Sequence, residues 1–356
     1  MNEKKELKLT VASSPHVNSP VGTRSLMLDV LIALAPALCA GVYFFGPRTL
    51  LLTLVSVVGC EFFEWGYRKL LHKPGTNGDL SAAITGVLLS FVCPVALPYW
   101  TVLIGDFFAI VVVKQLFGGL GKNFLNPALA GRAFLMLSYP VFMTTWVKPG
   151  INNWMGITTA VTDAVSSATP LSNDFMHKGL VASAGIGDMF IGNIGGCIGE
   201  VSALALIAGG VYLIIRGVIN FRVPAAYNGT VAVLTFIFSQ GNPRIEWMAA
   251  ELFGGGLMLG AFFMATDYVT SPCTPKGELI YGLGCGLLTV FIRYFGGYPE
   301  GVSYAILLMN VCVWIIDKYT KPSRFGVTKE AVKAAKEAEK AAKAAAKAAK
   351  KGDAAK

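Results

Sequence analysis

The apolar residues of this chain are gathered into long runs, and most polar residues stand in the short segments between them. A helix needs about 20 largely apolar residues to cross a hydrocarbon layer about 30 Å thick. Ten runs approach that length and are candidate membrane-spanning helices: residues 25–45, 50–67, 80–97, 100–116, 126–145, 198–215, 223–239, 248–265, 279–295 and 301–316. The pattern predicts an all-α polytopic membrane protein with about ten transmembrane helices.

The composition agrees with a membrane protein. Of the 356 residues, 54% are hydrophobic and 14% are charged, which is too little polar surface to cover a soluble core of this size. The net charge is +9, and residues 329–356 supply five of these charges with nine Lys and four acidic residues. A basic excess confined to a tail does not indicate a nucleic-acid partner. We expect the tail to be solvated and partly helical, with binding to anionic membrane lipid as the alternative.

Lysine and arginine are distributed unevenly among the loops, which predicts the orientation of the chain. With the N-terminus inside, only five remain outside: Arg48, Lys148, Lys178, Arg244 and Arg293. An even number of helices returns the C-terminus to the cytoplasm. We expect a cytoplasmic segment (1–24), a five-helix repeat (25–145), an external loop (146–193), a second five-helix repeat (194–318) and a cytoplasmic tail (319–356). The charged start lacks the apolar core of a signal peptide, so the first helix is expected to direct insertion.

A weak internal similarity relates the two five-helix parts. The triplet FGG recurs after 178 residues, and the same offset places Pro94 on Pro272. Because each part crosses the membrane an odd number of times, the two copies must be inverted relative to each other. In such folds, segments interrupted at matching positions mark a site near the middle of the membrane. Here these are the stretches that contain Cys93 and Cys273.

Ionisable side chains inside a bilayer cost several kcal/mol, so each one is a candidate functional group. Asp106 and Glu61 are flanked by apolar residues, and Asp29 lies early in the first run, so these three are candidates for an ion path. For Asp29, Glu64 and Asp267, the alternative is a position near the headgroups where the carboxylate is paired or solvated.

The seven cysteines are spread singly, which predicts no zinc site or iron–sulfur cluster held by this chain alone.

Two polar segments separate the runs. In residues 117–135, three closely spaced glycines precede Asn126. Glycine would let the backbone approach a ligand closely, and Asn126 is suited to be the N-cap of the next helix. A tight cytoplasmic turn is the alternative, because no phosphate-binding GxxxxGK[ST] pattern follows.

Residues 163–175, DAVSSATPLSNDF, contain four hydroxyl side chains around one proline. Such hydroxyls commonly form turns or cap helices, so by themselves they indicate no chemistry.

Five blocks of sequence together resemble a known family: SSPHVNSPVGTRSLMLDVLIALAPAL (13–38), GGLGKNFLNPALAGRAF (118–134), DAVSSATPL (163–171), FFMATDYVTSP (262–272) and YPEGVSYAILLMN (298–310). Up to about Arg324, the chain resembles the membrane flavoprotein subunits of the RnfD and NqrB type. These are the D subunit of the Rnf ion-translocating ferredoxin oxidoreductase and the B subunit of the sodium-pumping quinone reductase. The length of this chain looks more like that of the Rnf protein. The lysine-rich tail is not part of the family pattern.

In that family, a threonine in an S-[GS]-A-T pattern is joined to FMN by a phosphoester bond. The resemblance implies that Thr169 is this residue, preceded by Ser166, Ser167 and Ala168, with Ser167 where many members have glycine. Pro170 favours an extended backbone at Thr169, which would present its hydroxyl to a flavin transferase that moves FMN from FAD. A covalent bond would keep a flavin on the outer side from dissociating.

The resemblance also implies partners and a second cofactor. Such a protein works in a complex of the prokaryotic cell membrane, together with a flavin subunit, iron–sulfur subunits and small membrane subunits. The complex couples electron transfer to outward movement of Na⁺ or H⁺. A second flavin, riboflavin, is associated with the family, and we expect it near Asn126, Thr266 and Asp267. The inverted five-plus-five arrangement resembles urea and ammonium channels.

Two other classes of function are consistent with the residues alone. A cofactor-free channel or secondary transporter of the inverted-repeat type would share the composition. A structural anchor for a soluble oxidoreductase would leave the polar external loop and the intramembrane acids without a purpose. Covalent flavin at Thr169 would distinguish a redox subunit from a channel or transporter and from a structural anchor.

Overall fold

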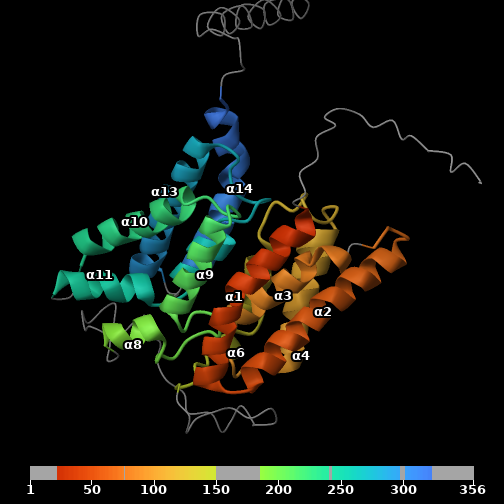
Figure 1. The fold of residues 1–356 in the computed structure, drawn as a ribbon, viewed down its shortest axis with the longest axis horizontal. Coiled ribbons are helices and arrows are strands. Elements are labelled where there is room, and N and C mark those ends of the chain that lie inside the picture. The colour runs from red at the N-terminus through yellow and green to blue at the C-terminus, as the bar shows by residue number, and fades with distance from the viewer. Residues whose placement is uncertain (1–21, 76, 150–184, 240–242, 297–300, 323–356) are drawn as a thin grey trace, which may run out of the picture.

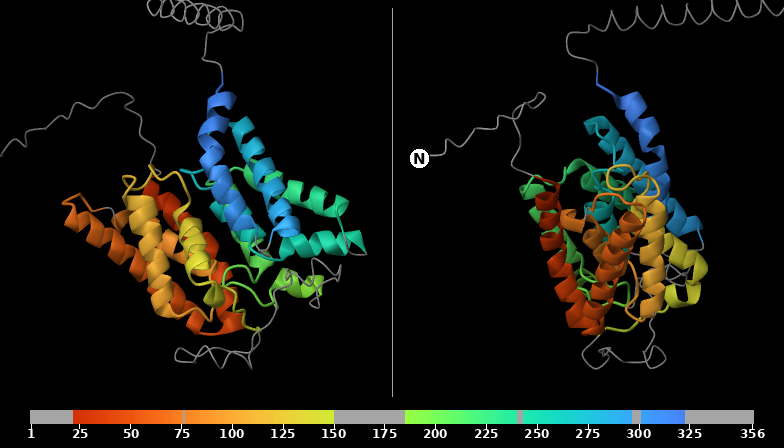
Figure 2. Two further views of the ribbon diagram at one scale, coloured as in Figure 1. Left: turned by 180° about the vertical axis from the view of Figure 1, so that it is seen from behind. Right: turned by 90° about the vertical axis from the view of Figure 1, so that its right-hand side faces the viewer.

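The structure is a computed structural model, and it describes residues 22–75, 77–149, 185–239, 243–296 and 301–322. Every regular element in these residues is a helix, as the apolar runs predict. Figure 1 shows the helices gathered into one bundle, with the early helices at one flank and the late helices at the other. The views in Figure 2 show the same division into two groups.

The first half of the bundle contains the described segments that precede residue 150. They are α1 (Thr23–Phe45), α2 (Arg48–Leu70), η1 (Asn77–Asp79), α3 (Ser81–Phe91), α4 (Tyr99–Phe107), its continuation as the π-helix η2 (Phe108–Gln115), α5 (Pro127–Ser138) and α6 (Pro140–Met143). α5 begins where the sequence predicts. Asn126 Oδ1 accepts hydrogen bonds from the backbone N of Ala128 and Leu129 at 3.1 and 3.4 Å, and Pro127 occupies the first turn.

The second half contains α8 (Ile186–Ile191), α9 (Ala203–Ile215), α10 (Arg222–Ile237), α11 (Arg244–Phe253), α12 (Leu257–Leu259), its continuation as the π-helix η5 (Gly260–Met264), α13 (Pro275–Phe295) and α14 (Val302–Thr320). α13 starts in the same way as α5. Its N-cap residue Thr274 accepts from the backbone N of Gly277 at 3.0 Å, and Pro275 occupies the first turn.

Four of the described helices are long and apolar enough to cross a bilayer, namely α1, α2, α13 and α14. α11 and the α12–η5 segment meet at an angle of 60° and together make a fifth, bent candidate. α3 and α9 are apolar but shorter. The described residues therefore form a multi-pass membrane protein, and the number of ten crossings stays a prediction.

Each predicted run overlaps a helix, but some helices are shorter than their runs. The run 80–97 is helical only to Phe91, and Pro94 follows in the connecting segment. The run 198–215 is helical only from Ala203. Hydrophobicity continues beyond these helix ends because the connecting segments are buried as well.

The two halves match in order after a shift of 178 residues: α1 overlaps α9, α2 overlaps α10, α3 overlaps η5, α4–η2 overlaps α13 and α5 overlaps α14. Two side chains also join the halves reciprocally. Arg132 on α5 donates from Nη1 to Ser303 Oγ at the start of α14 over 2.8 Å. With its amide oriented to satisfy its neighbours, Asn310 on α14 accepts from the backbone N of Asn126 over 3.2 Å. Asn310 stands 178 residues after Arg132, so inverted halves would produce this pairing.

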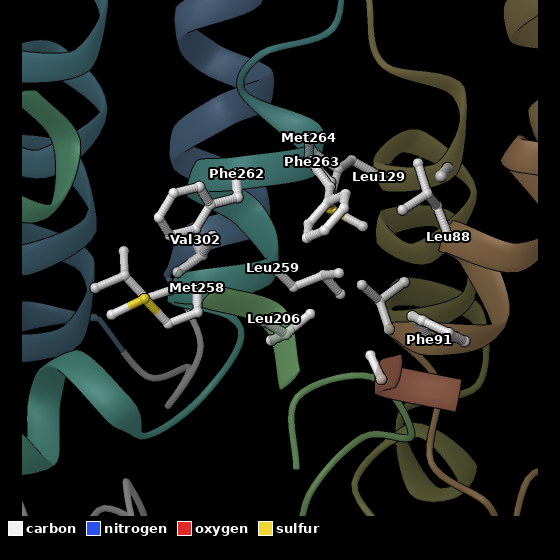
Figure 3. Packing of buried hydrophobic residues seen from close by; sticks show 14 of the residues in the cluster. Leu88, Phe91, Leu129, Leu206, Met258, Leu259, Phe262, Phe263, Met264 and Val302 are labelled. Atoms are coloured by element: carbon white, nitrogen blue, oxygen red, sulfur yellow. The ribbon is translucent and has the colours of Figure 1, made fainter. Parts of the chain in front are cut away.

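The hydrophobic core lies between the two halves (Figure 3). Leu88 and Phe91 on α3 meet a group from the second half that includes Leu259 on α12. Glycine allows a close approach of two helices in the first half. A Cβ on Gly86 would lie 2.8 Å from the backbone O of Ser56, so α3 packs directly on the backbone of α2.

Candidate cofactor-binding site

A pocket lies between the two halves of the protein, lined by α1, α3, η2, α9, η5 and the segments before α5 and after η5. Its apolar walls include Ile84, Leu88, Leu213, Phe262 and Phe263. Its polar lining includes Ser81, Lys114, Asn123, Asn126, Thr266 and Asp267. A mainly apolar hollow with a few converging polar groups is the usual form of a small-molecule site.

Asn126 links the two halves at the wall of this pocket. While its Oδ1 caps α5, its Nδ2 donates to the carbonyl O of Met264, the last residue of η5, over 3.4 Å. The residue is only 3% exposed. One side chain thus positions the start of a helix in the first half against an interrupted helix of the second.

Thr266 and Asp267 stand in the turn that follows η5. Thr266 Oγ1 donates to the carbonyl O of Phe262 over 2.7 Å, and Asp267 Oδ2 accepts from Thr270 Oγ1 over 3.1 Å. The neighbouring Tyr268 hydroxyl donates to the carbonyl O of Val218 and so fastens the turn to the segment after α9. The structure therefore brings Asn126, Thr266 and Asp267 into one pocket.

Lys114 is a further pocket residue that sequence reasoning missed. It lies on the π-helix η2, is 2% exposed, and donates from Nζ to Glu64 Oε2 and to Ser81 Oγ, each over 2.7 Å. Ser81 Oγ in turn donates to Asp79 Oδ1 over 2.7 Å. The only signal in the sequence is one lysine within the apolar stretch FAIVVVKQ. The network places a compensated positive charge at the pocket wall.

Of the three ion-path candidates, Asp29 is buried but paired with an exposed arginine, and Glu61 is half-buried. Asp29 on α1 accepts from Arg216 Nη2 at both carboxylate oxygens, over 3.2 and 3.1 Å, and from the Tyr212 hydroxyl over 3.1 Å. This pairing is what the alternative interpretation of Asp29 expects. Glu61 on α2 is half-buried and lines a shallow surface hollow together with Phe62 and Trp65.

Asp106 on α4 is the interior candidate, and its side chain is fully buried. Its Oδ1 lies 2.7 Å from Ser56 Oγ and 3.3 Å from Cys60 Sγ, both on α2. Within the residues that the structure describes, its Oδ2 has no hydrogen-bond partner. This carboxyl group is held by a hydroxyl and a thiol instead of a cation.

The two interrupted stretches named from the repeat have different surroundings. Cys93 is fully buried, and its carbonyl O accepts from the backbone N of Ile198 over 3.1 Å. Cys273 is exposed, and its backbone N donates to Asp317 Oδ1 over 3.1 Å. The pocket is lined by the helices next to these stretches and by neither cysteine.

Thr169, with Ser166, Ser167 and Ala168, lies outside the described residues, so its modification with FMN stays a prediction. The pocket between the two halves, by contrast, can be compared with a flavin ring. Such a ring has an apolar benzenoid end and a polar pyrimidine edge. Phe262 and Phe263 offer an apolar surface, and amide, hydroxyl and ammonium groups lie on the same pocket. The residues present therefore fit a group of that chemistry.

Comparison with known proteins identifies relatives over nearly the whole chain. The family described as NQR2, RnfD, RnfE matches residues 10–326. A similar protein is the D subunit of the Na⁺-translocating ferredoxin:NAD⁺ oxidoreductase complex of Acetobacterium woodii, 48% identical over 91% of this chain and 97% of its own length. Another is the D subunit of the proton-translocating ferredoxin:NAD⁺ oxidoreductase complex of Clostridium ljungdahlii, 42% identical over 90% of this chain and 97% of its own length.

A third relative is the D subunit of an ion-translocating oxidoreductase complex from Mannheimia succiniciproducens, 36% identical over 88% of this chain and 96% of its own length. The matched region includes every described helix and the SSAT segment. The chain therefore belongs to the NQR2, RnfD, RnfE family.

Proposed function

We propose that this chain is the membrane flavoprotein subunit of an ion-translocating electron-transport complex. In this proposal Thr169 carries FMN through a phosphoester bond, and electron transfer through the protein is coupled to outward movement of Na⁺ or H⁺. The observation that carries the proposal is full-length similarity to proteins named as D subunits of such complexes, at 48% and 42% identity. The segment SSATP in the predicted external loop supports the attachment site.

The residues of the chain would divide the work between two sides of the membrane. Thr169 would supply the oxygen of the phosphoester on the outer side. On the inner side, Phe262 and Phe263 would pack against the ring of a second flavin, riboflavin. Asn126 and Thr266 would orient its polar edge. The flavins supply redox chemistry, and the protein determines their positions and potentials.

The coupling ion is not given by the family. One relative is named for Na⁺ and another for protons, although both are similar to this chain over about the same length. Asp106, Glu61 and Asp29 are the carboxylates that we propose for the ion path. The three lie on different helices, α4, α2 and α1, and Asp106 and Asp29 have different partners.

The proposal also includes partners. Electrons would come from a flavin subunit and iron–sulfur subunits, and small membrane subunits would pack beside this one. A flavin transferase would act on Thr169. The outward-facing apolar side chains of α2, Leu54, Val58 and Phe62, suit contact with lipid or with the helices of such subunits.

The covalent flavin is tested on protein purified from a host that has the transferase. Denatured protein should give a fluorescent flavin band on a gel, and a peptide containing Thr169 should gain the mass of FMN less one water. Thr169→Ala should lose both signals, and the neighbouring change Ser167→Gly should keep them. A colourless chain, or a Thr169→Ala variant that still holds flavin after denaturation, would contradict the proposal and favour a cofactor-free channel or transporter.

A further inference from the structure

Asp106 lies near the middle of a predicted membrane-spanning run, where its side chain is completely buried between α4 and α2. Its Oδ2 faces Gly59 on α2: a Cβ at Gly59 would lie 2.8 Å from this oxygen. In the described part of the chain, no ion pair includes Asp106. An ionised carboxylate in this position would be buried without a compensating charge, which is strongly unfavourable.

The hydrogen bonds of Ser56 indicate which form of Asp106 is present. Ser56 Oγ lies 2.7 Å from Asp106 Oδ1 and 2.9 Å from the carbonyl O of Gly86. A hydroxyl group has one hydrogen, and a carbonyl oxygen can only accept. A separate hydrogen for each contact requires that Ser56 donates to Gly86 and that Asp106 donates to Ser56. The second condition requires a proton on the carboxyl group.

The charged groups on the surrounding helices are compensated elsewhere. On η2, Lys114 Nζ lies 2.7 Å from Glu64 Oε2. On α5, Arg132 Nη1 lies 3.6 Å from Glu200 Oε1. On α2, the thiol of Cys60 lies 3.3 Å from Asp106 Oδ1. On α3, the carbonyl O of Gly86 contacts Ser56 Oγ, which in turn contacts Asp106. The next acid on α2, Glu61, is half-buried.

The same surroundings do not suit a metal cation. Cations such as Na⁺ prefer several oxygen ligands, whereas Asp106 has one hydroxyl oxygen and one sulfur in contact. In the described residues no group of three or more His, Cys, Asp or Glu is placed to hold a metal ion. A proton needs only the carboxyl oxygen and one acceptor.

The backbone changes its winding directly after this residue. α4 ends at Phe107, and the chain continues as the π-helix η2 from Phe108. A π-helical stretch is rare, and such stretches are frequently found at functional sites. Its place beside an acid without an ion pair is a second, independent sign of function at Asp106.

We propose that Asp106 is a proton-binding site of the membrane interior, which holds a proton in this conformation and donates it to Ser56 Oγ. Binding of the proton rests on the local structure alone. Its use as a step of ion movement rests on the function proposed above. On that basis the ion that this site binds is H⁺, and Glu64 and Asp29, which are paired with basic residues, remain ionised.

The protonation state is tested by labelling with an apolar carbodiimide in membranes that contain the intact complex, near neutral pH. The protonated acid adds across one C=N bond of the reagent: its oxygen bonds to carbon and its proton moves to nitrogen, so the adduct has the combined mass. We expect mass spectrometry to find this adduct on Asp106 and to find none on Glu64 or Asp29. These two acids serve as internal controls in the same sample.

Asp106→Asn is the matched variant, because its amide has the shape of the neutral acid. It should lose the adduct and also the infrared carbonyl band of a protonated carboxylic acid. Glu64→Gln should keep both signals. The proposal is wrong if Asp106 is unlabelled in the parent protein, or if added Na⁺ suppresses its labelling, which would indicate a Na⁺ ligand. Labelling needs no electron flow and no flavin, so loss of flavin in Thr169→Ala should leave it unchanged.

Discussion

Two buried acids lie at the same helix interface, yet they are stabilised in opposite ways. Glu64 on α2 and Lys114 on η2 form an ion pair at 2.7 Å near the pocket. About two turns nearer the N-terminus, Asp106 on α4 hydrogen-bonds with Ser56 and Cys60 on α2, and among the described residues it has no ion pair. The first acid is compensated by a cation, and we infer that the second is neutral. A bilayer interior therefore accepts a carboxyl group by pairing or by protonation, and only the second form can release a proton without breaking an ion pair.

The largest expected effect on stability comes from breaking the Glu64–Lys114 ion pair. Lys114→Met should lower the free energy of unfolding by about 3–5 kcal/mol, because Glu64 is left buried without its closest partner. Unfolding of the purified protein in detergent measures this. The double variant Lys114→Met, Glu64→Leu should recover part of the loss, since the buried carboxylate is removed as well; Arg68, 3.8 Å from Glu64 Oε1, loses its ion-pair partner in that variant. A loss as small as that of an exposed pair, under about 1 kcal/mol, would remove the distinction between the two acids.

The contact between α2 and α3 is expected to matter next. Gly86→Ala should cost about 1–3 kcal/mol, because the new Cβ would lie 2.8 Å from the backbone O of Ser56 and would push the helices apart. Gly66→Ala on α2 is the control, since nothing lies within 4 Å of a Cβ there. It should be neutral or slightly stabilising. Equal effects of the two changes in the same unfolding assay would show that the interface around Ser56 is not closely packed.

A smaller effect is expected at the pocket wall. Asn126→Ala should cost about 1 kcal/mol through loss of the helix cap, and it should also reduce the amount of flavin extracted from the native protein without a covalent bond. Ser202→Ala is the matched control, because Ser202 Oγ caps α9 outside the pocket by accepting from the backbone N of Ala205 over 3.3 Å. That variant should lose similar stability and keep its flavin. If both variants keep the same flavin content, Asn126 has no binding role.

The smallest effect on stability is expected at Asp106. Asp106→Asn should change the free energy of unfolding by less than about 1 kcal/mol, because an amide replaces a neutral acid and can still hydrogen-bond to Ser56. The same assay, run beside Glu64→Gln, gives the direct comparison. A loss as large as that of Lys114→Met would mean that Asp106 is ionised and that Ser56 and Cys60 stabilise its charge.

Sequence reasoning located much of the pocket but missed its buried cation. The family resemblance led us to expect a second flavin near Asn126, Thr266 and Asp267. The structure places all three residues on one pocket. Lys114 was missed because its apolar neighbours made the residue look like one more position of a spanning run. A lysine in such a run costs several kcal/mol, and that cost was the available signal.

The sequence by itself determined the membrane class, the helical character and the approximate position of each helix, because hydrophobic length is a local property of the chain. It also contained the 178-residue offset that aligns the two halves. Only the tertiary structure decided which acids are paired. Glu64 and Lys114 are 50 residues apart, and so are Ser56 and Asp106, and nothing local tells which acid meets a cation. That choice depends on how α2 packs against the α4–η2 segment, so the difference between a charged and a neutral acid arises only when the helices assemble.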